Sequence, residues 1–410
     1  MKADLKSYAL ITAAYWGFTI TDGALRMLVV LHFYQLGYNE VTIAFLFLFY
    51  EFFGIVTNLF GGWIASRSGL RFTLYGGMIL QIVALLMLAG LQPGWIEYWS
   101  VVYVMCAQAL SGIAKDLTKM SAKSAIKVIV PAGDEGALFK WVSRLTGSKN
   151  ALKGVGFFVG GILLTALGFV GSLVAMAAGL AVILLGIAFV LSDDLGRSKK
   201  KIKFTALFAK SAAINWLSAA RVFLFAARDV WFVVGLPVFL SQLGWSSAQV
   251  GAFLALWVIG YGIIQAGVPG LLRLLGTHTV GCGAAAFWAF LLVTLPMSML
   301  LALTAGAPPA LTLMIGLGVF AVVFAINSAV HSYLVLAYTD ADNVAVDVGF
   351  YYMANAGGRL LGTLLSGLTF VSAGFVGCLI GSAILALTSA ILATRLPRSA
   401  QVLPSGTATS

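Results

Sequence analysis

Apolar residues occur in twelve long runs along this chain, and each run is long enough to form a bilayer-spanning helix of about 20 residues. The runs are separated mostly by short segments that contain glycine and polar residues. This pattern predicts an all-α integral membrane protein with twelve transmembrane helices. The predicted helices cover residues 8–34, 41–64, 72–91, 96–116, 138–168, 171–191, 213–240, 247–272, 277–301, 309–337, 345–371 and 374–395.

One long charged segment, residues 192–203, interrupts the series between the sixth and seventh predicted helices. It divides the chain almost in half. We therefore expect a six-helix half over residues 1–191, a cytoplasmic linker over residues 192–212 and a second six-helix half over residues 213–410.

The two halves resemble one another at fixed spacings. A spacing of 207 relates Asp22 to Asp229, Gln35-Leu36-Gly37 to Gln242-Leu243-Gly244, and Asn58 to Gln265; further along, a spacing of 206 relates Lys149 to Asn355, Lys153 to Arg359, Gly156 to Gly362 and Gly168-Phe169 to Gly374-Phe375. A parallel six-plus-six repeat is the organisation of major facilitator transporters, in which the substrate site lies between the halves near the middle of the membrane. The repeat therefore predicts the major facilitator fold.

Composition excludes a soluble globular domain. The chain is 61% hydrophobic and 10% charged, with a mean hydropathy of +1.00, whereas about a quarter of the residues of a soluble domain are charged. The formal net charge of +11 comes from basic residues at both ends and in alternate loops. The positive-inside rule then places both termini in the cytoplasm, and we expect no nucleic-acid partner.

Cysteine and histidine residues are scattered along the chain. Cys106, Cys282 and Cys378 lie in separate apolar runs, without the spacing of a disulfide framework or a metal site. We expect no metal and no cofactor. Of the three histidines, His331 is better explained as a core residue with satisfied hydrogen bonds than as a proton relay.

The first predicted helix carries a polar stripe formed by Tyr15, Thr19, Asp22 and Arg26, whose i+4, i+3 and i+4 spacings place them on one face. A charge at mid-bilayer costs about 2.5–3.5 kcal/mol on insertion scales, so such a helix usually faces a water-filled cavity or a partner. The alternative is an internal Asp22–Arg26 ion pair that only makes the helix insertable.

Cations outnumber acids by six to three among the ionisable residues within predicted helices: Arg26, Lys149, Lys153, Arg221, Arg228 and Arg359 against Asp22, Glu51 and Asp229. Buried positive charge requires a compensating anion. The planar guanidinium group of arginine can donate two parallel hydrogen bonds to phosphate-like or carboxylate oxygens. We therefore expect an anionic substrate. The candidate binding residues are Arg26, Lys153, Arg228, Arg359, Lys149, Tyr15, Asn58 and Asn355.

The candidate proton-coupling residues are Asp22, Glu51 and Asp229. Glu51 has no charged counterpart in the repeat, and burial of a lone carboxyl group favours its protonated form. A protonated Glu51 bonded to a neighbouring helix is the alternative. Arg228 and Asp229 are adjacent and therefore point about 100° apart, which makes a direct bridge between them less natural.

Several basic residues have simpler explanations than substrate binding. Arg221, near the cytoplasmic end of its helix, and Lys149 can place their charged groups at the membrane surface. The series Lys115, Lys119, Lys123 and Lys127 continues the fourth predicted helix into the cytoplasm. It is best explained by contact with the anionic leaflet, although Lys115 can reach a cavity mouth.

The loop after the second predicted helix, residues 62–71, resembles the major facilitator signature, with Gly62, Arg67, Gly69 and Arg71 in register. A tight basic loop can bond acids or carbonyl groups and so hold one face of a gate closed. Ser66 occupies the position where that family usually has aspartate, which removes the usual form of this contact.

Four segments, residues 15–29, 48–63, 147–158 and 228–240, resemble the ArsJ family, the organoarsenical efflux branch of the major facilitator superfamily. The resemblance implies a bacterial inner-membrane exporter of 1-arseno-3-phosphoglycerate. A partner glyceraldehyde-3-phosphate dehydrogenase makes this compound from arsenate and glyceraldehyde 3-phosphate. The acyl arsenate falls apart outside the cell, so the cycle confers arsenate resistance. We expect a monomer.

Other functions are compatible with parts of the pattern. A multidrug/proton antiporter would share the fold but would present acids rather than excess cations to its cavity. An organophosphate or other organic-anion permease fits the cations equally well and differs in transport direction. A membrane-embedded enzyme or receptor lacks support, because no nucleophile–base pair or phosphate-binding glycine loop accompanies the repeat.

Overall fold

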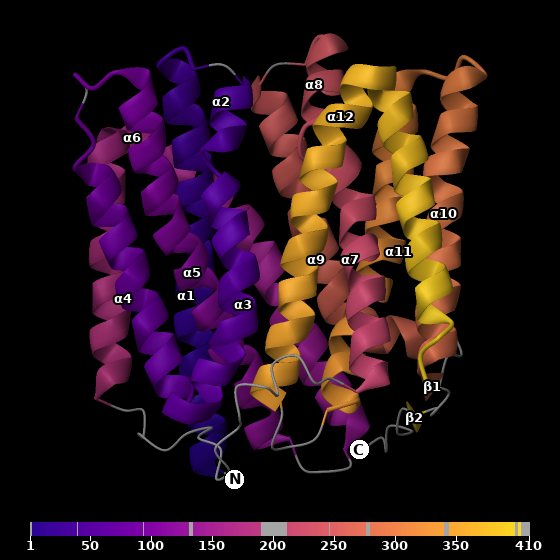
Figure 1. Ribbon diagram of the computed structural model, residues 1–410, viewed down its shortest axis with the longest axis horizontal. Helices are drawn as coiled ribbons and strands as arrows, with labels where there is room; N and C mark the ends of the chain where they lie inside the picture. The colour runs from indigo at the N-terminus through magenta and orange to yellow at the C-terminus, as the bar shows by residue number, and fades with distance from the viewer. Residues whose placement is uncertain are drawn as a thin grey trace. The chain divides into compact units, whose positions relative to one another are not determined.

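The computed structural model describes residues 2–38, 40–92, 94–130, 134–189, 211–245, 247–275, 279–339, 344–397 and 401–402. In this part of the chain, helices account for nearly all of the regular structure (Figure 1). The helices are α1 (Lys2–Gln35), α2 (Glu40–Phe45), α3 (Leu48–Ser68), α4 (Leu70–Ala89), α5 (Glu97–Ile129), α6 (Glu135–Ala188), α7 (Ala212–Phe232), α8 (Gly235–Gln242), α9 (Ser247–Leu274), α10 (Cys282–Thr304), α11 (Pro309–Ala337) and α12 (Val344–Ala393).

These helices account for the twelve predicted spans. Gly168 interrupts α6 and Ala373 with Gly374 interrupts α12, so each of these long elements contains two successive spans. The second predicted span is divided into α2 and α3, and the seventh into α7 and α8. Within the described part, seven helices meet the length and hydropathy expected of a membrane-crossing segment, with α6 and α12 each counted once. The all-α, twelve-span prediction is confirmed.

The structure differs most from the prediction at three boundaries. The first predicted helix, expected from residue 8, begins as α1 at Lys2. The fourth predicted helix, expected over residues 96–116, continues as α5 to Ile129. The ninth, expected from residue 277, begins as α10 at Cys282 after a two-residue strand, β1 (Thr279–Val280), which pairs with β2 (Gln401–Val402). Residues 192–210 of the predicted linker lie outside the described part, so the division at 192–212 stays a prediction.

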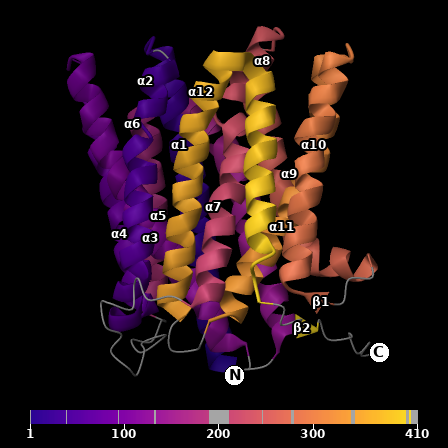
Figure 2. The ribbon, with the colours of Figure 1, turned by 45° about the vertical axis from the view of Figure 1, so that its right-hand side comes forward.

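The chain groups into two compact units. Unit 1 consists of Met1–Ile129, Ser148–Ala209 and Asp340–Ala356, and unit 2 consists of Val130–Gly147, Lys210–Thr339 and Gly357–Ser410. Within unit 1, α1, α3, α4 and α5 run beside one another; within unit 2, α7, α9, α10 and α11 do the same (Figures 1 and 2).

Local signals in the sequence fix several helix ends. The Ser211 side chain accepts a hydrogen bond from the Ile214 backbone N–H at the start of α7, as expected of an N-cap. Pro309 occupies the first turn of α11, where a missing N–H costs nothing. Gly69, between α3 and α4, has a φ of 87°, a left-handed conformation that glycine adopts without strain.

Matched features support the internal repeat. Gly168 and Gly374 both have positive φ, at 68° and 61°, and form equivalent kinks. Gly37 and Gly244 have φ values of 86° and 87° at equivalent turns. In unit 1 the His32 ring stacks on Phe169 at 3.9 Å; in unit 2, Phe239, which is 207 residues after His32, stacks on Phe375 at 4.8 Å.

Glycines bring α6 close to α1 in unit 1. A Cβ atom on Gly23 would lie 2.5 Å from the Lys153 carbonyl oxygen, and a Cβ on Gly156 would collide with the Ile20 carbonyl oxygen. The equivalent packing in unit 2 places Gly362 of α12 against α7, where a Cβ would lie 2.7 Å from the Asp229 Cβ. Small residues at such crossings are the usual basis of close helix packing in membranes. Both crossings lie within one helical turn of a buried aspartate.

We predict that Gly156→Ala destabilises unit 1 by about 1–3 kcal/mol, because the added methyl group has no space against the α1 backbone. Gly161→Ala is the matched control, since a Cβ at Gly161 meets nothing within 4 Å. The measurement is reversible unfolding of the purified protein in mixed SDS micelles. Equal stability of the two variants would contradict the proposed close packing.

Candidate functional site

In unit 1, a buried carboxylate on α1 lies between two partners. Asp22 Oδ1 accepts a hydrogen bond of 2.5 Å from the Tyr50 hydroxyl of α3, and Asp22 Oδ2 lies 3.1 Å from Lys153 Nζ of α6. Since burying an unpaired charge is costly, this pairing allows Asp22 to remain ionised with only 5% of its surface exposed. The aspartate thus connects three helices.

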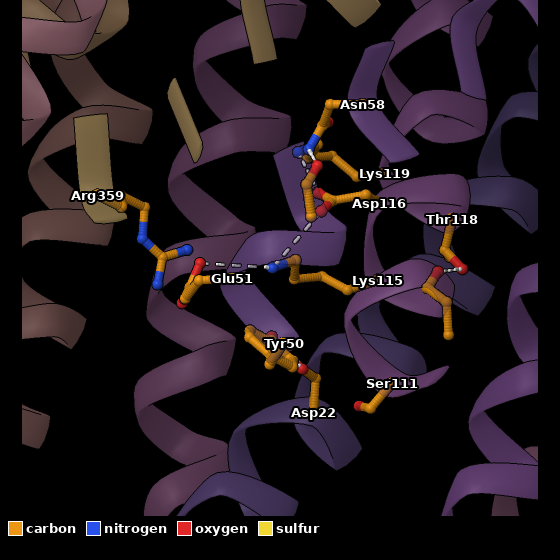
Figure 3. Close-up of polar contacts among 12 residues, drawn as sticks. Asp22, Tyr50, Glu51, Asn58, Ser111, Lys115, Asp116, Thr118, Lys119 and Arg359 are labelled. Carbon is orange, nitrogen blue, oxygen red and sulfur yellow. Dashed lines mark hydrogen bonds and ion pairs between the residues drawn. The ribbon is translucent and has the colours of Figure 1, made fainter. Parts of the chain in front are cut away.

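A second set of charges alternates in sign across α1, α3 and α5. Arg26 donates to Glu51 Oε1 at 3.0 Å, and Lys115 Nζ lies 4.0 Å from Glu51 Oε2 and 3.6 Å from Asp116 Oδ2. Lys119 donates to Asp116 Oδ1. Figure 3 shows Lys115 between Glu51 and Asp116. We call this series, Arg26–Glu51–Lys115–Asp116–Lys119, the charge ladder.

The charge ladder corrects two expectations from the sequence. Glu51 is not a lone carboxylate, because Arg26 and Lys115 both face it. Lys119 and Lys123 are buried rather than held at the leaflet surface, and their ammonium groups lie 4.3 and 4.8 Å from the Tyr352 ring centroid. The surface explanation is wrong for these two lysines because it treated the lysine series as one solvated face. The side chain of Lys127 lies outside the described part of the chain, so its surface placement stays a prediction.

Two members of this site were missed by the sequence analysis. Tyr50 presents its ring to cations, with Lys115 Nζ at 3.9 Å, the Arg26 guanidinium carbon at 5.1 Å and Lys153 Nζ at 6.0 Å from the centroid. Asp116 is almost completely buried. The available signals were the adjacency of Tyr50 to Glu51 and the i,i+3 spacing of Asp116 and Lys119.

The remaining unit 1 candidates occupy different environments. Tyr15 is buried, and its hydroxyl has no hydrogen-bond partner within the described residues. Asn58 is fully buried and donates to the Gly54 carbonyl oxygen at 2.5 Å, one turn before it on α3. Lys149 on α6 and Asn355 on α12 are half-buried.

Unit 2 contains a cluster centred on the equivalent aspartate. Arg228 Nε donates to Asp229 Oδ1 at 2.6 Å, and Arg359 Nε of α12 lies 3.6 Å from Asp229 Oδ2. Arg228 and Asp229 form the direct bridge that the sequence made the less natural arrangement, because the long arginine side chain reaches the neighbouring carboxylate. The Arg228 guanidinium also lies 4.8 and 5.3 Å from the Phe225 and Phe324 rings.

Arg221 does not extend to the membrane surface. It is 2% exposed, donates to the Ser328 carbonyl oxygen at 3.3 Å and lies 4.0 Å over the Phe225 ring. Nearby, His331 on α11 is fully buried, yet neither ring nitrogen has a hydrogen-bond partner among the described residues. The structure therefore contradicts surface placement of Arg221 and places His331 in the core, as expected.

The two clusters use equivalent positions of the repeat. Lys153 pairs with Asp22 in unit 1, and Arg359, 206 residues further on, pairs with Asp229, which is 207 residues after Asp22. In unit 1 the cation comes from α6, whose Gly156 packs closely on the aspartate helix α1. In unit 2 it comes from α12, whose Gly362 packs closely on the aspartate helix α7. The repeat thus preserves the ion pair while replacing lysine with arginine.

The predicted gating loop is described only in part. The side chains of Ser66 and Arg67, and the surroundings of Gly62, lie outside the described part of the chain. Arg71, at the start of α4, donates to the Ala188 carbonyl oxygen at 3.4 Å, and Tyr75 donates to the Ile187 carbonyl oxygen at 3.0 Å. Both side chains bind the end of α6, where helix carbonyl groups lack internal partners.

Comparison with solved structures identifies the fold. A bacterial homologue of the iron transporter ferroportin, in an outward-facing state, is similar with a TM-score of 0.73 at 17% identity, over 94% of this chain and 98% of that chain. The human organic anion transporter MFSD10 (TETRAN) gives 0.72 at 14% identity, over 95% of this chain and 99% of that one.

XylE, a proton:xylose symporter of the major facilitator superfamily bound to 6-bromo-6-deoxy-D-glucose, gives a TM-score of 0.75 at 12% identity over 95% of each chain. The chain therefore has the major facilitator fold. No protein-family model matches the sequence. No curated protein sequence matches it either.

We predict that Asp22→Asn and Lys153→Met each destabilise the protein by roughly 3 kcal/mol, because each leaves one buried charge without its partner. The double variant is expected to lose at least about 1 kcal/mol less than the sum of the two single losses. SDS unfolding measures all three variants, with Lys140→Met at an exposed position of α6 as the control. Strict additivity would mean that Asp22 and Lys153 do not interact.

Proposed function

We propose that this protein is a secondary active transporter of the bacterial inner membrane that exports an anionic organoarsenical, 1-arseno-3-phosphoglycerate. Arg26 and Lys153 in unit 1, and Arg228 and Arg359 in unit 2, are the principal groups that bind its oxyanions. Tyr15, Asn58, Lys149 and Asn355 complete the proposed binding set.

The observation that carries the anionic substrate class is the excess of cations in the two clusters. In unit 1, Arg26, Lys115, Lys119 and Lys153 stand against Asp22, Glu51 and Asp116; in unit 2, Arg221, Arg228 and Arg359 contact a cluster whose acid is Asp229. Excess positive charge in a low-dielectric environment favours the binding of an anion. Arginine and lysine also provide the donors that phosphate-like oxygens accept.

The organoarsenical itself is supported by the resemblance of residues 15–29, 48–63, 147–158 and 228–240 to the ArsJ family. Several residues of the two clusters, including Asp22, Arg26, Glu51, Lys153 and Asp229, fall within these segments. A partner glyceraldehyde-3-phosphate dehydrogenase supplies the substrate in this proposal. The substrate is a multiply charged anion with an oxyanion at each end, which suits clusters in which several cations surround few acids.

Asp22, Glu51 and Asp229 are the proposed proton-coupling groups. Each of these carboxylates pairs with a cation of the proposed binding site. An incoming anion competes for that cation. A carboxylate that loses its cation is protonated more readily. An organophosphate or other organic-anion permease would use the same cations. A multidrug/proton antiporter is less compatible, because cations dominate both clusters.

We predict that expression in an arsenate-sensitive bacterium lowers cell arsenic and permits growth on arsenate only when the partner dehydrogenase is also present. The two-gene requirement follows because the exported species must first be made by the enzyme. Growth and total cell arsenic are measured with each gene alone and with both. Resistance from the transporter alone would indicate export of arsenate itself. Absence of any effect from protein that is present in the membrane would favour another organic anion.

We also predict that Arg26→Gln and Arg359→Gln abolish this efflux while membrane levels remain unchanged, because each removes a donor from a proposed oxyanion site. Lys140→Gln, at an exposed position, is the matched control. Normal efflux from both variants would exclude these residues from substrate binding. In inverted vesicles, a transport rate that does not respond to an imposed pH gradient would exclude proton coupling.

A further inference from the structure

The charge ladder already contains an anion at the position that an incoming oxyanion requires. One carboxylate oxygen of Glu51 accepts from Arg26 at 3.0 Å, and the other lies 4.0 Å from Lys115. A ligand that bridges these same donors of Arg26 and Lys115 must therefore take the place of this carboxylate group.

Exposure identifies the end of the charge ladder that a ligand meets first. The Arg26 side chain is 27% exposed, compared with 10% for Glu51, 13% for Lys115 and 1% for Asp116. An anion approaching Arg26 finds a guanidinium group with one donor already bound to Glu51. Bidentate binding through the guanidinium edge that faces Glu51, the strongest mode for a planar oxyanion face, requires that bond to break.

The two acids of the charge ladder differ in how firmly they are held. Asp116 is bonded to Lys119 and lies against α3, where a Cβ on Gly54 would be 2.9 Å from Asp116 Oδ2. Glu51 lies in the first turn of α3, directly after the break between α2 and α3, and has a longer side chain. The helix N-terminus also favours a carboxylate nearby once it has left Arg26. Glu51 is therefore the displaceable acid.

We propose that Glu51 is a built-in competitor that restricts the unit 1 site to oxyanions carrying at least two negative charges. This inference rests on the proposed function and adds a basis for its selectivity. A single carboxylate on a ligand gains little by replacing an equivalent carboxylate that is already tethered. A phosphate or arsenate dianion interacts more strongly with Arg26 and Lys115 and displaces Glu51.

The position equivalent to Glu51 in unit 2 is uncharged. The residue 207 positions after Glu51 is Val258, so the equivalent position on α9 carries no competing acid. Among the described residues of the unit 2 cluster, Arg228 and Arg359 both contact the carboxylate of Asp229. The proposed restriction on ligand charge is therefore assigned to Glu51, and a single substitution can remove it.

The test compares 3-phosphoglycerate with glycerate, which has the same carbon skeleton without the phosphate group. Binding of each is measured by calorimetry on the purified full-length protein in lipid nanodiscs. For the wild type we expect glycerate to bind at least tenfold more weakly than 3-phosphoglycerate. In Glu51→Gln we expect glycerate binding to become about tenfold tighter, so that the discrimination falls. Glu97→Gln, at the exposed start of α5, is the control and should leave both affinities unchanged.

The outcomes separate this inference from the proposed function. If the wild type binds 3-phosphoglycerate and Glu51→Gln retains the same discrimination, the competition is overturned and the proposed substrate class stands. If the wild type binds neither compound, that substrate class fails. In that case, glycerate binding by Glu51→Gln alone would still support the competitor, and absence of binding by either protein would overturn it. Thermal unfolding of each variant confirms that it remains folded.

Discussion

Each unit of this protein depends on the pairing of one buried aspartate with a cation from another helix. In a medium of low dielectric constant, Asp22 and Asp229 are stable as charged groups only if neighbouring cations compensate them. Lys153 and Arg359 do so from α6 and α12, and the close glycine contacts bring those helices near enough for the charges to meet. Packing and electrostatics therefore reinforce one another: without the small residues the helices would separate, and without the cations the carboxylates would be too costly to bury.

The two ion pairs also show how a repeated architecture can diverge while its geometry is retained. Unit 1 uses lysine and adds the charge ladder around Tyr50, whereas unit 2 uses two arginines, of which Arg228 lies against phenylalanine rings. A lysine is a compact point charge, and an arginine is a planar fork that stacks on aromatic faces. The clusters thus differ in their chemistry, although both originate from the same positions of the repeat.

Much of the fold could be predicted from the sequence because span length and hydropathy are imposed by the bilayer on each segment separately. The repeat extended this to the paired positions of Asp22 with Asp229 and Lys153 with Arg359. The partners of charges on different helices were harder to predict, since helix rotation and side-chain reach depend on packing. Glu51 was taken as isolated because Arg26 lies on another helix. Asp116 was overlooked within a lysine-rich series. The burial of Arg221 depends on Phe225, one turn along α7, and on Ser328 of α11, which no local pattern identifies.

The kinks at Gly168 and Gly374 affect how the chain can be assembled in the membrane. At each kink, one or two residues with non-helical backbone angles separate two spans, so almost no chain remains to form a loop. The short connection therefore holds the two spans of each pair together as a helical hairpin, with the glycine at its tip. Such a hairpin can enter the bilayer as one unit.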